Sequence, residues 1–324
     1  MWIGSFVDCL EESTLSHPRF EEAYAIKQQN IPKRIYKYRR DCDYSRANLR
    51  TDTVWLSSPD SYNDPYDCAF AVLKDSKDIV MAAAIKVIFD EITDACKYRQ
   101  AISIDVIEKA KASREPLRSI AEYMSTLGID IESQDPHRWA ERSSVQLNGL
   151  ICEIDATLNL VRRNAKVCSF SAISDSILMW SHYADNHRGF CVEYDLDPLV
   201  PNHPFRRNLY PVIYSPDLYD LTPWLKSLVD SDLQQFNSIH PLLALIHKFD
   251  GWGYEQEWRL ALVLPTLIED HDLKVPRPIR IFLGSKMEHT NKNELRAICE
   301  EKGIEVWQMQ MADDKYRLFA ERQH

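Results

Sequence analysis

Short apolar runs separated by turn-forming residues dominate the chain outside its middle third. Runs rich in β-branched and aromatic residues predict strands over 35–38, 53–56, 165–170, 190–194, 209–214, 257–264, 279–283 and 304–309. Apolar residues at helical spacing predict helices over 174–187, 232–249 and 291–301. At least six short strands flanking a helical block predict an α+β fold built on a mixed or antiparallel sheet.

The helical block itself covers residues 75–165, where strand signals are few. We interpret it as a helical insertion in a β-rich body. We predict that residues 1–33 form a helical lead-in that ends near Pro32. Residues 34–324 are predicted to form a single α+β domain. Ser174 and Asp175 are expected to cap the helix over 174–187, which ends at Gly189. Asn291 and Glu294 have the spacing of a capping box.

Composition argues against several classes of nucleic-acid- and nucleotide-binding protein. The chain has 39 Lys and Arg against 49 Asp and Glu, a net charge of −10, which argues against sequence-blind binding of duplex DNA. Only 8 of its 324 residues are glycine, and neither a dinucleotide-binding nor a P-loop glycine motif is present. If the protein binds a nucleotide, side chains are therefore expected to hold the phosphates.

Cysteine usage and hydropathy point to a cytoplasmic protein. The 8 cysteines include no C-x-x-C pair, and several lie within apolar runs, which is typical of buried thiols in a reducing compartment. This pattern predicts no metal site. No signal peptide is visible and no apolar run approaches 18 residues, so we expect no membrane partner.

Two clusters near the N-terminus combine aromatic and polar residues at strand ends. On a strand, Tyr36 and Tyr38 share one face, and Arg39 lies on the other. The guanidinium of Arg39 would suit a phosphate or a carboxylate, or it would lie on a solvated edge. The turn-rich stretch over 55–67 would form one wall of a pocket and supply Asn63 or Asp64, or it would be only a rigid turn.

Two later clusters carry hydroxyl and carboxylate groups. Ser169 and Ser171 share a strand face and precede a helix that carries His182 and Tyr183. His182 is either a general base or a structural hydrogen-bonding residue. Glu255 and Glu257 share one face of an extended segment, ready for an electron-deficient carbon or an incoming hydroxyl. Alternatively, Glu257 forms a structural ion pair with Arg259 or Arg39.

In their order along the chain, these motifs resemble the bacterial family called domain of unknown function 2971. The residues that carry the resemblance are Tyr36-Lys37-Tyr38-Arg39, then 55–59 and 62–67, then 179–187 with 189–191, and finally 254–260 with 281–286. The resemblance spans roughly residues 34–318. It implies relatedness but no activity.

The order of the polar residues is also similar to the Arg–Ser–Glu class of ADP-ribosyltransferases. This resemblance implies an ADP-ribosyltransferase-like fold in which Arg39 holds NAD, Ser169 orients the nicotinamide ribose and Ser171 supports that strand. Glu257 would be the catalytic carboxylate, with Glu255 nearer the acceptor. The sequence departs from that class at Ser169-Phe170-Ser171, where Phe stands in place of Thr.

We therefore expect ADP-ribosyl transfer or NAD cleavage, with NAD as substrate and an unknown macromolecular acceptor, in a toxin or a phage-defence effector. Cleavage of the nicotinamide–ribose bond develops oxocarbenium character, which a fixed carboxylate stabilises. Tyr38, Asn63, His182 and Tyr183 would complete the NAD site, the tyrosines by stacking.

Two alternatives remain open from the sequence. The same pocket would serve a non-catalytic module that binds a nucleotide or a protein. Asp64, Asp67, Glu255 and Glu257 would instead serve a metal-dependent enzyme that processes nucleic acids.

Overall fold

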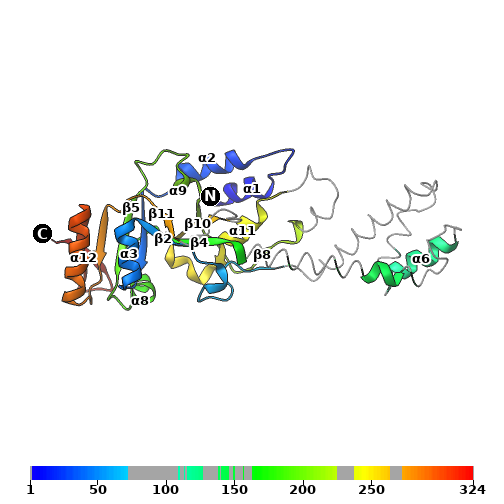
Figure 1. The fold of residues 1–324 in the computed structure, drawn as a ribbon. Helices are drawn as coiled ribbons and strands as arrows, with labels where there is room; N and C mark the ends of the chain where they lie inside the picture. The colour runs from blue at the N-terminus through cyan, green and yellow to red at the C-terminus, as the bar shows by residue number, and fades with distance from the viewer. Residues whose placement is uncertain are drawn as a thin grey trace.

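A computed structural model describes residues 2–71, 163–224, 237–262 and 272–323 (Figure 1). It also describes scattered residues between 109 and 156, including the helix α6 (Pro116–Thr126). Most of the predicted insertion over 75–165 lies outside the described residues. In the part of the chain that the structure covers, no helix has the length and apolar character needed to cross a membrane.

The centre of the molecule is one mixed sheet of eight strands, which confirms the predicted α+β fold with a mixed or antiparallel sheet of at least six strands. Its spatial order is β14-β13-β12-β5-β1-β4-β10-β6. All neighbouring pairs are antiparallel except β12 and β13. The strands are β1 (Arg34–Arg39), β4 (Lys166–Ser171), β5 (Phe190–Asp195), β6 (Leu209–Pro211), β10 (Glu257–Leu262), β12 (Arg280–Leu283), β13 (Glu305–Met311) and β14 (Leu318–Arg322).

Three pairs of short strands lie beside this sheet. They are β2 (Thr53–Trp55) with β11 (Asp272–Lys274), β3 (Phe70–Ala71) with β8 (Tyr219–Asp220), and β7 (Ile213–Ser215) with β9 (His247–Phe249). The helices are α1 (Trp2–Glu11), α2 (Phe20–Asn30), α3 (Asp43–Thr51), α8 (Ile177–Tyr183), α9 (Pro204–Arg207), α11 (His240–Ile246) and α12 (His289–Lys302), with 3₁₀ turns η1 (Pro59–Ser61) and η3 (Asp250–Glu255).

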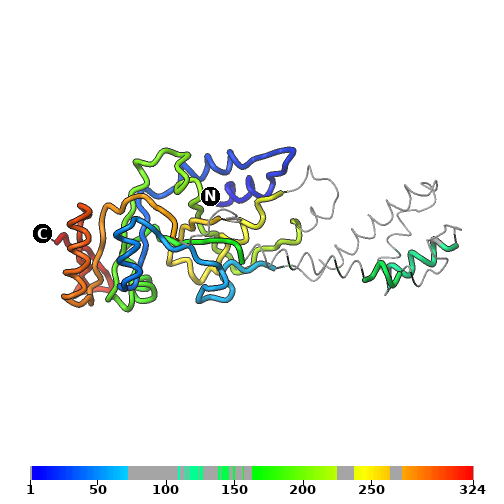
Figure 2. Tube along the Cα trace, viewed as in Figure 1, coloured from blue at the N-terminus to red at the C-terminus, as the bar shows by residue number. Residues whose placement is uncertain are grey.

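The two faces of the large sheet have different characters because side chains alternate along each strand. One face carries Ile35, Phe170 and Ile281 into the main core, together with Leu49 of α3 and Leu295 of α12. The opposite face is apolar at one end, where α8 packs, and polar near β4 and β10. In Figure 2 the N-terminal helices, in blue, lie along the top of the view, and α12, in orange, lies at its left edge beside the C-terminus.

Several local predictions need correction. Of the helix predicted over 232–249, the structure describes residues 237–249, and these are helical only in α11, since His247–Phe249 is the strand β9. The strand predicted over 209–214 is split into β6 and β7, and β14 was not predicted. The N-caps of α8 and α12 are Ser176 and Glu288, so the capping residues predicted for both helices were wrong.

The helix predicted to reach residue 187 ends at Tyr183, because Asp185, Asn186 and His187 all adopt left-handed backbone conformations with φ of 48°, 53° and 68°. The chain then passes through Gly189, where an added Cβ would overlap the carbonyl oxygen of Arg39. This close approach requires glycine, because any side chain would displace β1.

A buried lysine in α2 gives a prediction for stability. Lys27 is fully buried, and its ammonium donates to the carbonyl of Arg207 at 2.5 Å and lies over the rings of Tyr24 and Tyr210. None of the described carboxylates forms an ion pair with it. Burial, together with Arg207 and Arg206, lowers the pKa of Lys27 from 10.5 to about 7.

The unfolded chain keeps this proton up to about pH 10.5, whereas the folded chain loses it near pH 7. The buried ammonium therefore opposes folding at low pH, and this penalty shrinks as the pH rises from about 7. We therefore expect Lys27→Met to raise the free energy of unfolding by about 1–3 kcal/mol at pH 6. The gain should shrink towards pH 10. Chemical denaturation of both proteins across this range tests the prediction, and a gain that is the same at every pH would contradict it.

Candidate functional site

Three segments that are distant in the chain meet on the polar face of the sheet. In the register of the sheet, Ser171 of β4 is opposite both Tyr36 of β1 and Glu257 of β10, and Ser169 is opposite Arg259. Directly opposed residues project to the same face of a sheet. The serine pair and Glu257 therefore lie side by side, as the sequence predicted.

A pocket of about 180 Å³ opens above this row. Its walls come from β1, β4, α8, the loop before β3 and the segment from β9 to β10. Seven of the nine side chains proposed from the sequence line it, namely Tyr38, Asn63, Ser169, Ser171, Tyr183, Glu255 and Glu257.

Arg39 does not reach this pocket. It lies three positions beyond Tyr36, so alternation along β1 puts its side chain on the opposite face of the sheet, and it is opposite Phe190 of β5. Its guanidinium donates to Asn48 of α3 at 3.2 Å. The expectation that Arg39 shares one crevice with Ser169 and Glu257 is therefore corrected.

His182 is exposed and does not line the pocket. Its ring contacts Trp252 edge-on, with centroids 6.4 Å apart, and lies 6.3 Å from the ring of Tyr254. His182 is the residue before Tyr183, which does line the pocket. His182, Trp252 and Tyr254 thus form an aromatic group next to Tyr183.

A buried network of charges forms the floor of the pocket. Arg259 is fully buried, and its Nε lies 2.7 Å from Glu257 Oε1 and its Nη2 lies 2.7 Å from Asp67 Oδ1. Lys248 Nζ lies 2.6 Å from Glu255 Oε2 and 2.8 Å from Glu257 Oε2. Three carboxylates thus face two cations, which leaves one negative charge in excess when all are ionised.

Hydroxyl groups complete the polar interior. Tyr183 donates to Glu255 Oε1 at 2.7 Å, and Ser171 donates to the backbone carbonyl of Glu255 at 2.7 Å. Tyr38 donates to the carbonyl of Ile173 at 2.9 Å. Ser171 and Tyr38 thus fix the backbone around the pocket, whereas Tyr183 contacts a carboxylate directly.

The two glutamates have pKa values shifted in opposite directions. Burial alone would raise the pKa of Glu257, but Arg259 and Lys248 outweigh it and hold the pKa well below the usual range. Burial and the charge of Glu257 raise the pKa of Glu255, and Lys248 and Tyr183 only partly offset them. Glu257 is therefore a permanent charge, and Glu255 is the group that can exchange a proton.

Sequence reasoning missed part of this network. The alternative ion pair of Glu257 with Arg259 is present, and the E-x-R spacing on a strand was its signal. Asp67 was considered only as a metal ligand. Lys248 was not considered, because the residues around it predicted a helix rather than the strand that turns its side chain inward.

The loop over 55–67 does form one wall, with Asn63 in the pocket. Asp64 instead accepts from Trp252 Nε1 at 2.8 Å and from the backbone N–H of Tyr66 at 2.9 Å, which fastens the loop. The hydroxyl of Tyr62 is buried, and no partner for it is found among the described residues. Its ring lies 6.0 Å from the Arg259 guanidinium.

Comparison with protein families gives one match. Residues 179–260 match the family described as Protein of unknown function (DUF2971). The chain resembles the DUF2971 family, as its motifs predicted. The match covers most of α8, Glu255 and Glu257, and is narrower than the span of 34–318 expected from the motifs. No curated protein and no solved structure matches the chain.

Proposed function

We propose that this DUF2971-like protein breaks the nicotinamide–ribose bond of NAD and passes the ADP-ribosyl group to water or to a macromolecular acceptor. The observation that carries the proposal is the pair Glu255 and Glu257, whose pKa values are shifted apart on the floor of one pocket. Two carboxylates in environments that differ in this way are typical of glycosidic-bond chemistry.

The carboxylates of the pocket suit the cationic end of NAD. The nicotinamide ring carries a positive charge, which moves to the ribose as the bond breaks. Ionised Glu255, Glu257 and Asp67 are matched in number by Lys248, Arg259 and Lys37, which also lines the pocket. Because the two glutamates are fixed on the floor of the pocket, they stabilise a cation that develops against them more strongly than they would in bulk solvent.

The proposed step balances without another reagent. The bond between ribose C1′ and the ring nitrogen breaks, and its electron pair stays on nicotinamide, which leaves as a neutral molecule. An oxygen of water or of the acceptor forms the new bond to C1′. Glu255 takes the proton of that oxygen and passes it to solvent. Glu257 stays ionised throughout and stabilises the positive ribose.

The diphosphate is expected to remain at the open mouth of the pocket. Lys248 and Arg259 are already paired with carboxylates, and Lys37 donates to the carbonyl of Ser169 at 2.7 Å. Lys248 and Arg259 are therefore not free to bind a phosphate, whereas Lys37 has no carboxylate partner among the described residues and keeps two N–H donors. Tyr36, Tyr38 and Tyr183 offer ring faces on which nicotinamide could stack instead.

The pH dependence of the reaction follows from Glu255. Its pKa is raised above 4.5, so the base is ionised only above that raised value. We expect NAD cleavage to fall as the pH drops through the pKa of Glu255, and to lose this acid limb in Glu255→Gln, whose remaining activity should be low at every pH. Release of nicotinamide measured from pH 4 to 9 tests this. An acid limb that persists in Glu255→Gln would assign the titration to another group.

One observation favours a non-catalytic module that binds a nucleotide as the second candidate. Every carboxylate oxygen of Glu255 and Glu257 has a hydrogen-bond partner within the protein, as expected of a network whose role is structural. NAD that raises the melting temperature and is recovered unchanged would support this candidate and contradict cleavage.

A metal-dependent nuclease is less favoured, because a divalent ion would have to displace Lys248. Nuclease activity lost on chelation would revive it.

If cleavage consumes cellular NAD, the protein would act as a toxin or a phage-defence effector. Expression of the wild type should then deplete NAD, whereas Glu257→Gln should not. A modified host protein would identify the macromolecular acceptor.

A further inference from the structure

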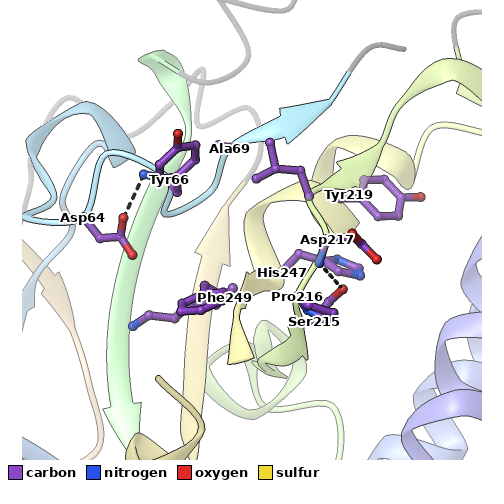
Figure 3. A pocket seen from close by; sticks show the side chains of 11 residues that line it. Asp64, Tyr66, Ala69, Ser215, Pro216, Asp217, Tyr219, His247 and Phe249 are labelled. Carbon is purple, nitrogen blue, oxygen red and sulfur yellow. Dashed lines mark hydrogen bonds between the residues drawn. The ribbon is translucent and has the colours of Figure 1, made fainter. Parts of the chain in front are cut away.

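A second, larger cavity of about 340 Å³ lies on the other side of β9 (Figure 3). Lys248 borders both cavities, but its ammonium is bonded to the two glutamates of the first. The neighbouring residues His247 and Phe249 line only the second, as alternation along a strand requires. A volume above about 300 Å³ is in the range of small-molecule sites.

The walls of this cavity are aromatic and open to solvent. The side chains of Tyr66 and Phe249 are 65% and 53% exposed, and Leu218 between β7 and β8 is 41% exposed. Exposed apolar residues gathered around one cavity point to a binding surface. The ring of Phe249 packs against Gly251, where an added Cβ would lie 2.5 Å from it.

Apart from Lys248, whose ammonium is bonded to the two glutamates, the charged groups that line the cavity are acceptors. Asp64 and Asp217 contribute carboxylates. The Nδ1 of His247 donates to the carbonyl of Leu243 at 2.6 Å, which leaves Nε2 as an acceptor in the neutral ring. In Figure 3, Asp64 and Tyr66 lie on one side, and Ser215 and Asp217 on the other. Such a site attracts N–H and O–H donors and repels phosphate.

We propose that this cavity binds a purine nucleoside, with the base against Phe249 and Tyr66 and the amino and hydroxyl groups donating to Asp64 and Asp217. Flat rings stack on aromatic side chains, and ribose hydroxyls commonly donate to a carboxylate. A phosphorylated nucleotide binds more weakly, because the cavity holds two carboxylates and its lysine is already paired. This site is additional to the NAD pocket and does not depend on cleavage.

Isothermal titration with adenosine tests the proposal. Stacking on an aromatic side chain contributes about 1–3 kcal/mol, so Phe249→Ala and Tyr66→Ala should each weaken binding roughly 5- to 150-fold. Tyr316→Ala is the matched control, because Tyr316 is fully exposed on the connection between β13 and β14. Its affinity for adenosine should equal that of the wild type. Adenosine 5′-monophosphate should bind less tightly than adenosine, and the difference should shrink in high salt.

A further pair of variants keeps the test decisive. Asp217→Asn changes an exposed side chain, so it should fold normally and weaken adenosine binding. Glu257→Gln should leave adenosine binding unchanged, which separates this site from the NAD pocket. The proposal is overturned if millimolar adenosine shows no saturable binding, or if folded Phe249→Ala binds it as tightly as the wild type does. It is also overturned if Glu257→Gln, but not Phe249→Ala, abolishes binding.

Discussion

Arg259→Met is expected to lower the free energy of unfolding by about 3–5 kcal/mol, a large share of the roughly 5–15 kcal/mol that stabilises a typical domain. Arg259 is completely buried and pairs with both Glu257 and Asp67. Methionine fills a similar volume but leaves these two carboxylates with Lys248 as the one cation paired with them among the described residues. Leaving a charge buried without its partner costs much more than the intact pair contributes.

Urea denaturation of the purified variants measures this effect. Arg280→Met is the matched control, because Arg280 pairs with the buried Glu193 but remains 28% exposed, and Arg34 also pairs with Glu193. Its loss should be smaller. In a double-mutant cycle, Glu257→Gln should cost less in the Arg259→Met background than in the wild type. If Arg259→Met is as stable as Arg280→Met, the network is not the structural centre that we infer.

Glu257→Gln is expected to reduce NAD cleavage roughly 100- to 1,000-fold, the usual size of the loss when one preorganised charge or dipole is removed. Glutamine keeps the shape of the side chain but removes the permanent negative charge on the floor of the pocket. The positive ribose then faces Arg259 and Lys248 with one carboxylate fewer to balance them. Release of nicotinamide and the melting temperature should be measured on the same samples.

Glu193→Gln separates loss of a catalytic charge from loss of a buried one. Glu193 is 3% exposed, projects from the same face of the sheet opposite Tyr36, and is paired with Arg280, but it does not line the pocket. We expect it to lose stability and keep NAD cleavage. If Glu257→Gln cleaves NAD as fast as the wild type does, the proposed chemistry is contradicted. If Glu257→Gln and Glu193→Gln lose equal activity, the loss comes from damage to the fold and not from removal of a catalytic charge.

Much of the pocket could be predicted from the sequence because its residues come from short strands with clear alternation. The spacing of Ser169 with Ser171 fixes which side chains share a face within one strand. The same rule already separated Arg39 from Tyr36 and Tyr38. Alternation within a strand is a local property. Sequence alone therefore determined which residues of one strand share a face, the mixed α+β character and the resemblance to DUF2971.

Only the tertiary structure decided which of these sets face one another. The register that puts Ser171 between Tyr36 and Glu257 depends on long-range pairing, and it sends Arg39 to the opposite face. A shift of one residue would have reversed that outcome. Lys248 enters the site for the same kind of reason. Its apolar neighbours suit a helix locally, but pairing with β7 holds the segment extended and turns its ammonium towards buried carboxylates, where charge balance requires a cation.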